Sequence, residues 1–334
     1  MEDIKIQIEL FLVHCEKHRR LAKGSIKGYG IDLRMFSEYL RHSESQISRS
    51  EQVTKDVLEN YIMSISGKYK VKTIKRKMAC LRSFFGYLEE KEAIDDTPFR
   101  KFRLRLREGY RAPESLSIGE MNRFIKAVYD DQFATSAIKE LMRLKDEKNP
   151  YLKTLNGNFF WIRDIAIIEL LFATGLRVAE LCALRFRDYD RSERSLYIIG
   201  KGNKERILYL ENDEVLKVFD NYLFFRNAIA IDHSYVFITR FKEQMSTQAV
   251  RNLIAKYAAI AGINKNITPH VFRHSFASLL LESGVDIKYI QEFLGHSSIS
   301  TTQIYLHTSE NEKRKILASK HPRKQLGNHI LTID

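Results

Sequence analysis

Residues 161–184, WIRDIAIIELLFATGLRVAELCAL, decide the fold class, because long apolar runs recur there at helical spacing with few charges. Such a pattern predicts a helix buried in the core of a globular protein. Thr174-Gly175 interrupts the run, and since glycine often ends a helix, the stretch predicts two helices with a turn between them. Arg177 follows that turn three residues before Glu180, which puts both side chains on one helix face. Taken alone, this pair is more typical of a local surface ion pair.

A β pattern follows directly. Residues 184–190, LRFRDYD, and 195–210, SLYIIGKGNKERILYL, hold β-branched and aromatic runs around a Gly-Lys-Gly-Asn turn. They predict a small antiparallel sheet with Lys201 at its turn, where the ammonium group is free to reach outward, and Lys204 is a competing candidate. From Glu214 onward the periodicity is helical again. The second half of the chain is therefore expected to be mostly helical with one small sheet.

Residues 1–95 read as four amphipathic helices. The first has apolar side chains at helical spacing, and the second has Ser25 as a plausible N-cap. The third is expected to start near Thr54, and the fourth to run over residues 71–91. The whole chain is therefore predicted to be mainly α, with a four-helix N-terminal domain and a second helical domain that contains the small sheet.

The outer face of the fourth predicted helix is basic. Such a face is usually only solvated, but in a basic chain phosphate contact is favoured, because each cation on a phosphate releases a counterion. Residues 101–113, KFRLRLREGYRAP, then read as a basic linker, and Ser117 with Glu120 has the spacing of a capping box at a new helix start. We expect residues 1–108 to bind DNA and residues 109–334 to form the second domain. The candidate DNA-binding residues are Lys72, Lys75, Arg76 and Arg82.

Composition limits the possible functions. A chain of 334 residues favours two domains over a single core. With 55 Lys and Arg against 42 Asp and Glu, the formal charge is +13, and nucleic acid is the leading partner. No apolar run approaches the roughly 20 residues of a membrane-spanning helix, and the N-terminus does not resemble a signal peptide. The scattered Cys15, Cys80 and Cys182 fit buried side chains in a reducing cytoplasm rather than disulfides or zinc ligands.

A further stretch carries candidate chemistry at a helix start. His270 and Arg273 stand one helical turn apart directly after Thr268-Pro269. Because they would project near the positive end of a helix, they form a natural anion site. His274 lies four residues after His270, but zinc is disfavoured, since a third ligand is missing and valine occupies position 271, where a metalloprotease has glutamate.

The last candidate stretch is residues 294–305, LGHSSISTTQIY. It places His296 after a glycine and nine residues before Tyr305. Taken alone, the tyrosine is more typical of a half-buried packing residue. The turn would also suit a DNA-reading helix-turn-helix over residues 284–305.

In combination these residues resemble the tyrosine recombinase (phage integrase) family, whose catalytic set has the same residue types in the same order. The segments ATGLRVAEL, GKGNKER, HVFRHSFAS, LGHSSISTTQIY and KHPRK resemble those of its Xer type, and the N-terminal helices resemble its SAM-like, DNA-clamping core-binding domain. Residues 130–158 form a longer stretch than that type leads one to expect. The matching catalytic residues are Arg177, Lys201, His270, Arg273, His296 and Tyr305.

The resemblance implies a site-specific recombinase. Tyr305 would attack a DNA phosphodiester, form a 3'-phosphotyrosyl link and release a 5'-hydroxyl, so that two sites exchange strands through a Holliday junction. Arg177 and Arg273 would clamp the phosphate oxygens, and Lys201 would protonate the leaving oxygen. The reaction needs no ATP, metal or other cofactor.

The resemblance also implies supporting roles and partners. His270 would accept the tyrosine proton, His296 would hydrogen-bond the phosphate, and Glu180 would orient Arg177 or His270. The partners would be double-stranded DNA with specific sites and three further copies of the chain, in a tetramer that exchanges C-terminal segments. The alternatives are a non-catalytic helix-turn-helix regulator, a type IB topoisomerase and a metal-dependent nuclease.

Overall fold

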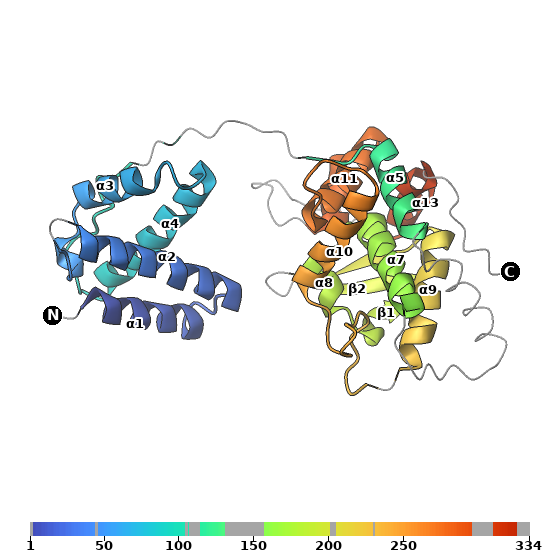
Figure 1. Ribbon diagram of the computed structural model, residues 1–334, viewed down its shortest axis with the longest axis horizontal. Helices are drawn as coiled ribbons and strands as arrows, with labels where there is room; N and C mark the ends of the chain where they lie inside the picture. The colour runs from blue at the N-terminus through green and yellow to red at the C-terminus, as the bar shows by residue number, and fades with distance from the viewer. Residues whose placement is uncertain are drawn as a thin grey trace. The chain divides into compact units, whose positions relative to one another are not determined.

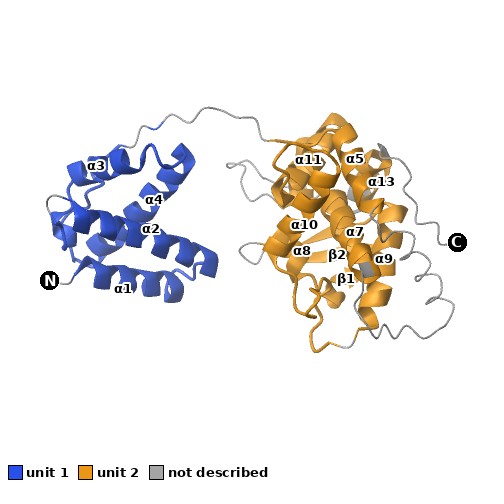
Figure 2. Cartoon of the chain, viewed as in Figure 1, with its two compact units in different colours: residues 1–111 blue, residues 112–334 orange. Residues whose placement is uncertain are grey.

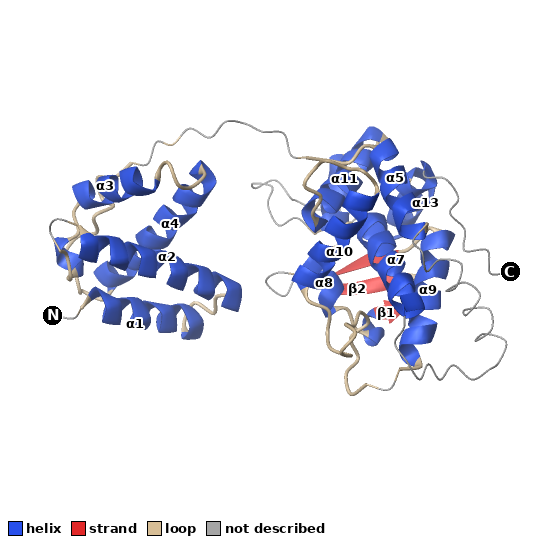
Figure 3. Ribbon diagram, viewed as in Figure 1, coloured by secondary structure: helices blue, strands red, loops and turns tan. Residues whose placement is uncertain are grey.

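The computed structural model describes residues 3–43, 46–103, 106, 114–130, 157–200, 205–229, 231–295 and 310–325. Most of the predicted basic linker and residues 131–156 lie outside this description. The chain divides into two units, residues 1–111 and residues 112–334 (Figure 2). Helices dominate both, and the predicted mainly α fold with one small antiparallel sheet is confirmed (Figure 3).

The first unit contains the four predicted helices (Figure 1). Their apolar faces meet in a core that is rich in aromatic side chains, among which Phe11, Phe36 and Phe84 are fully buried. The third helix follows Thr54 as predicted, since the Thr54 hydroxyl accepts a hydrogen bond from the main-chain N of Val57 at 3.4 Å. The helices are α1 (Ile4–Lys17), α2 (Lys23–His42), α3 (Lys55–Ile65) and α4 (Val71–Glu90).

The predicted N-cap at Ser25 is wrong. Helix α2 begins at Lys23, and the main-chain N of Ser25 donates to the carbonyl oxygen of Ala22 at 2.8 Å, so that Ser25 lies inside the first turn. Ala22 has an extended backbone and makes no side-chain cap. Residues 22–25 are exposed, so water can satisfy the N–H groups of this first turn without a hydroxyl cap.

The second unit is built around α7 (Gly157–Thr174). From Trp161 to Thr174 only Arg163 is partly exposed, which explains the apolar character of the stretch. The predicted break at Thr174-Gly175 is confirmed, and α8 (Val178–Ala183) follows it. Helix α7 packs against α9 and α11. The other helices of the unit are α5 (Ile118–Tyr129), α9 (Asp213–Asn227), α10 (Thr247–Ile260), α11 (Pro269–Glu282), α12 (Ile287–Leu294) and α13 (Glu310–Lys320).

Two local predictions in this unit are also confirmed. The main-chain N of Ser117 donates to Glu120 Oε2 at 2.9 Å and that of Glu120 donates to the Ser117 hydroxyl at 3.3 Å, which is the predicted capping box of α5. Throughout the chain the three cysteines, Cys15, Cys80 and Cys182, are free and buried, as expected for small apolar side chains. No helix of the described residues is long and apolar enough to span a membrane.

The sheet has the order β1-β2-β3 with antiparallel neighbours. Strand β1 is Tyr189–Asp190, β2 is Ser195–Ile199 and β3 is Glu205–Tyr209. Ile198 pairs with Arg206 and Leu196 with Leu208, so Arg206 lies on the face of the hairpin that carries the buried leucines. Residues 201–204 of the turn, which include Lys201 and Lys204, lie outside the described residues.

Gly175 joins α7 to α8 at a point where no side chain fits. Its φ is +61°, a backbone conformation that favours glycine, and a Cβ atom there would lie 2.7 Å from Phe276 Cδ1 and 2.8 Å from Leu294 Cδ2. Because Phe276 belongs to α11 and Leu294 ends α12, these two helices pack directly against the turn.

Residues 314–324 bind their own unit closely. Leu317 of α13 is buried in a cluster formed with residues of α11 and α12. His321 is also buried: its Nδ1 accepts from the main-chain N of Arg323 at 3.0 Å, which leaves Nε2 to donate to the carbonyl oxygen of Ala173 at 2.7 Å. Burial lowers the pKa of His321 to about 4, so the ring is neutral at physiological pH.

Arg323 forms further contacts next to His321, and we call residues 321–323 the C-terminal anchor. The Arg323 guanidinium donates to both oxygens of Glu169, at 2.9 and 3.0 Å, and lies 2.8 Å from a Glu214 oxygen. Tyr129 donates to the same Glu169 carboxylate at 2.9 Å. Burial alone would lower the pKa of Arg323, but Glu169 raises it above its ordinary value, so the ion pair stays charged. The anchor thereby ties residues 321–323 to α7 and α9.

Arg323→Ala is expected to lower the free energy of unfolding of the second unit by about 3–5 kcal/mol, because it leaves the buried Glu169 carboxylate without its cation. The fluorescence of Trp161, the sole tryptophan and 2% exposed, follows this unit during urea unfolding. Lys324→Ala removes the neighbouring exposed cation and serves as the control, with no comparable loss. Equal stability of the Arg323 variant and the parent would contradict the anchor.

Candidate active site

Arg177 begins the site as the N-cap residue of α8. Its main-chain N donates to Glu180 Oε2 at 2.9 Å, and its Nη1 donates to Glu180 Oε1 at 2.8 Å, so that the helix start and the ion pair share one carboxylate. The predicted geometry of this pair, with both side chains on one face, is therefore present. The remaining Nη2 of Arg177 donates to the carbonyl oxygen of Gly295 at 3.1 Å.

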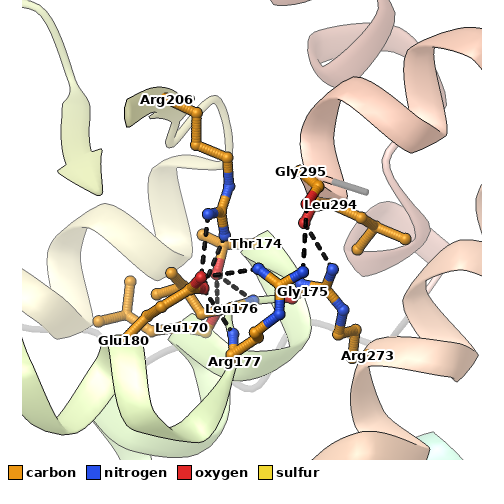
Figure 4. A network of polar contacts seen from close by, with 10 residues as sticks. All are labelled: Leu170, Thr174, Gly175, Leu176, Arg177, Glu180, Arg206, Arg273, Leu294 and Gly295. Carbon is orange, nitrogen blue, oxygen red and sulfur yellow. Dashed lines mark hydrogen bonds and ion pairs between the residues drawn. The ribbon is translucent and has the colours of Figure 1, made fainter. Parts of the chain in front are cut away.

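Arg273 reaches the same place from α11 (Figure 4). Its side chain is buried, and Nη1 donates to the carbonyl oxygen of Gly175 at 2.7 Å while Nη2 donates to that of Leu294. The two guanidinium groups are thus held by adjacent carbonyl groups at the end of α12, where Gly295 has the left-handed φ of 62°. Segments far apart in the sequence converge on one turn.

Glu180 is the carboxylate at the centre of this network. Its side chain is 5% exposed. Arg206 of β3 donates two hydrogen bonds to it, from Nη1 to Oε1 at 3.0 Å and from Nη2 to Oε2 at 2.7 Å. Burial alone would raise the pKa of Glu180, but the hydrogen bonds from Arg206 and Arg177 outweigh it and hold the pKa below its ordinary value. Glu180 is therefore a fixed negative charge at neutral pH.

The network carries more positive than negative charge. Burial, followed by the charge of Arg177, lowers the pKa of Arg273 to about 10, which still leaves it protonated at neutral pH. Three guanidinium groups against the single carboxylate of Glu180 leave a formal surplus of +2. Cations held this close repel one another, and a bound anion would relieve that repulsion. A phosphate group, whose oxygens accept the planar guanidinium fork, is suited to this position.

The sequence pattern did not single out Arg206. Strand alternation contains a usable signal, because Arg206 falls on the same face as Leu208, where an unpaired charge would be costly. A charged residue on the apolar face of a hairpin indicates a buried partner. Here that partner is Glu180.

His270 lies on the first turn of α11, directly after Pro269, and is exposed. The Thr268 hydroxyl caps this helix by accepting from the main-chain N of Val271 at 3.4 Å, so the predicted helix start is confirmed. His270 and Arg273 are therefore three residues apart near the positive end of α11. Among the described residues, no three His, Cys, Asp or Glu side chains are placed to hold a metal ion together.

The remaining predicted residues, Lys201, His296 and Tyr305, lie outside the described residues. Described parts of the network flank two of them in sequence. Gly295, which accepts a bond from Arg177, directly precedes His296, and Arg206 follows Lys201 by five residues.

The basic face of α4 is the second predicted site. Lys72, Lys75 and Arg82 are exposed, and Arg82 stacks on the Phe99 ring with its guanidinium carbon 5.3 Å from the ring centre. Lys75 and Arg82 line a groove with Arg103, whose apolar lining includes Met78 and Phe102. This arrangement offers cations next to apolar surface.

Arg76 differs from the other predicted DNA-binding residues. Its guanidinium pairs with Asp32 of α2, and its Nη2 donates to Asp32 Oδ1 at 2.9 Å, although half of the side chain is exposed. The same carboxylate accepts from the buried Lys77 at 2.9 Å. Arg76 therefore lies on the solvent side of α4 as predicted, and it also has a partner on another helix, which charge spacing along one helix does not reveal.

Residues 140–312 match the phage integrase family, and residues 8–92 match the phage integrase N-terminal SAM-like domain. The chain belongs to the phage integrase family. A tyrosine recombinase of Agathobacter rectalis is 38% identical over 97% of this chain and 99% of its own length. The tyrosine recombinase XerD of Halalkalibacterium halodurans is 30% identical over 97% of this chain and 100% of its own length.

The structure of the Tn1549 transposon integrase, solved with transposon right end DNA, has the same fold. It superposes with a TM-score of 0.69 at 18% identity and covers 94% of this chain and 98% of that one. This phage integrase family member is a tyrosine recombinase of Xer type, and therefore a DNA strand-exchange enzyme, as the sequence resemblance predicted. The non-catalytic regulator is not favoured.

Proposed function

We propose that this recombinase cleaves and rejoins DNA at specific sites through a covalent 3'-phosphotyrosyl intermediate held by Arg177 and Arg273. The observation that carries the proposal is the convergence of the two guanidinium groups at one turn with a surplus of positive charge. Preorganised cations of this kind stabilise the negative charge that grows on the non-bridging oxygens in the transition state.

The proposed reaction conserves bond energy. The phenolic oxygen of Tyr305 forms a bond to phosphorus while the bond from phosphorus to the 5'-oxygen breaks. His270 accepts the phenol proton, Lys201 supplies a proton to the 5'-oxygen, and His296 hydrogen-bonds the phosphate. Glu180 orients Arg177, to which it is bonded at 2.8 Å. A 5'-hydroxyl from a second site then attacks the phosphotyrosine, and no ATP, metal or other cofactor takes part.

The proposed partners are double-stranded recombination sites and further copies of the chain. Residues 1–108 would form a DNA-binding domain, and residues 109–334 the catalytic domain. In the first domain, Lys72, Lys75 and Arg82 would contact DNA phosphates. Arg76 would contact both a phosphate and Asp32. Exchange of two sites through a Holliday junction would need a tetramer. The exchanged C-terminal segment would come from the part of the chain that follows Tyr305. The cytoplasmic location stays a prediction.

Covalent trapping tests the proposed function directly. The parent chain is incubated with duplexes that carry candidate sites and a nick close to the cleavage position. Cleavage then releases a short fragment with the 5'-hydroxyl, which diffuses away, so that religation is prevented. We expect a protein–DNA adduct that forms equally well with a chelator present, and peptide mapping should place the DNA on Tyr305. An adduct on another residue, or cleavage that stops in chelator, would refute the mechanism.

Lys201→Ala is expected to slow cleavage of an ordinary phosphodiester by about 100- to 10,000-fold, the range of general acid catalysis. A duplex with sulfur in place of the bridging 5'-oxygen should recover most of that loss, because a thiolate leaves without a proton. The measurement is the rate of adduct formation on both duplexes, with Lys204→Ala as the control. Failure of the sulfur duplex to restore the rate would remove Lys201 from this role.

A further inference from the structure

We infer that Arg206 is a positioning residue, which fixes Glu180 and, through it, aims Arg177 at the scissile phosphate. The inference rests on the proposed function, because it assigns Arg206 to the same phosphate clamp. Arg206 is the member of the network contributed by the sheet, five residues after Lys201 on the same hairpin.

The first support is the geometry of the carboxylate. Each Glu180 oxygen accepts one bond from Arg206 and one from Arg177: Oε1 from the two Nη1 atoms at 3.0 and 2.8 Å, and Oε2 from Arg206 Nη2 at 2.7 Å and the Arg177 main-chain N at 2.9 Å. A two-bond fork fixes the plane of a carboxylate as well as its position. Without Arg206, Glu180 would keep its bonds to Arg177 but lose the contact that prevents both from rotating together.

The second support is the contact with Gly295. A Cβ atom at Gly295 would lie 3.0 Å from Arg206 Cδ and 3.3 Å from its Nε, so the stem of Arg206 covers this glycine closely. The carbonyl group of Gly295 is the acceptor for Arg177 Nη2. Arg206 therefore supports Arg177 in two places. It binds Glu180, the acceptor for Arg177 Nη1, and it packs against Gly295, the acceptor for Arg177 Nη2.

The third support is burial. The Arg206 side chain is 11% exposed and the Glu180 side chain 5%, so the pair is shielded from the solvent that weakens surface ion pairs. Arg206 directs both of its Nη groups to Glu180, whereas the Arg177 side chain is 32% exposed. The exposed cation would meet the phosphate and the buried one would hold the carboxylate behind it.

Arg206→Gln is expected to slow adduct formation about 100-fold, because a displacement of the clamp by about 1 Å has an effect of that size. DNA binding should stay at the parent value, and the urea midpoint reported by Trp161 shows whether the variant is folded. Arg191→Gln is the matched control, since Arg191 pairs with Asp220 at 3.0 Å in the same unit but is 79% exposed and outside the network. Its cleavage rate should equal that of the parent.

A neutral phosphate separates a positioning role from a merely structural one. A methylphosphonate at the scissile position carries no negative charge, so correct aiming of Arg177 matters less, and the gap between parent and Arg206→Gln should shrink to a few-fold. The same relative loss on both substrates would overturn the inference. If Arg206→Gln lowers the urea midpoint, Arg206→Lys replaces it as the test variant, because lysine keeps the charge without the two-bond fork. The gap in rate between Arg206→Lys and the parent should also shrink on the methylphosphonate substrate.

The two hypotheses fail differently in this experiment. If the parent forms no adduct on the ordinary duplex, the proposed function is wrong. If the parent forms the adduct and Arg206→Gln matches its rate, only the role of Arg206 is wrong.

Discussion

Tyr305→Phe is expected to abolish the covalent protein–DNA adduct and to leave binding of the site DNA unchanged. The substitution removes a single oxygen atom, so the shape and apolar surface of the residue stay the same, while no nucleophile remains to attack phosphorus. In other enzymes the loss of a covalent nucleophile lowers the rate by about a million-fold, which places the residual reaction below detection. Denaturing gels of the nicked-duplex reaction measure the adduct, and gel shifts of the same samples measure binding.

A second tyrosine variant controls for general effects of losing a hydroxyl group. Tyr235 lies in the same unit, where its hydroxyl accepts from Arg185 at 3.4 Å, away from the arginine network. Tyr235→Phe should form adduct at the parent rate. Trapping by Tyr305→Phe at the parent level would show that another atom attacks the DNA and would refute the assignment.

Arg177→Lys is expected to lower the rate of adduct formation by about 100- to 1,000-fold. Lysine keeps the positive charge, but a single ammonium group does not reproduce the planar fork that binds Glu180 and Gly295 at once. DNA binding should change little, because the total charge is conserved. Single-turnover cleavage with excess enzyme isolates the chemical step.

A control variant and a double variant test whether the slower cleavage by Arg177→Lys arises from the phosphate clamp. Arg185→Lys alters a guanidinium group that stacks on Tyr235, with the guanidinium carbon 4.8 Å from the ring centre, and should cleave at the parent rate. Combining Arg177→Lys with Arg206→Gln should slow cleavage far less than the product of the single effects, because both act through one carboxylate. A cleavage rate of Arg177→Lys within tenfold of the parent would exclude Arg177 from the phosphate clamp.

Local patterns predicted the parts of this chain that local forces determine. The break at Gly175 follows from backbone freedom, the sheet from alternation, and the capping box at Ser117 from spacing alone. The N-cap at Ser25 failed because a hydroxyl cap is only one way to satisfy exposed N–H groups.

The sequence pattern did not reveal ion pairs between residues that are far apart in the chain. The ion pairs of Arg76 with Asp32 and of Arg323 with Glu169 were not predicted from the sequence. In each case the acidic partner is distant in sequence, by 44 residues for Arg76 and 154 for Arg323. Periodicity describes which way a side chain faces along its own helix but not which element covers it.

The wide spacing of the network also determines when the site can form during synthesis. Arg177 bonds to a residue 118 positions away, Arg273 to one 98 positions away and His321 to one 148 positions away. A growing chain that has released its first unit from the ribosome can therefore fold that unit while the arginine turn still lacks its supports. The arginine turn is therefore complete only after residue 295 has been synthesised, and the C-terminal anchor only after residue 323.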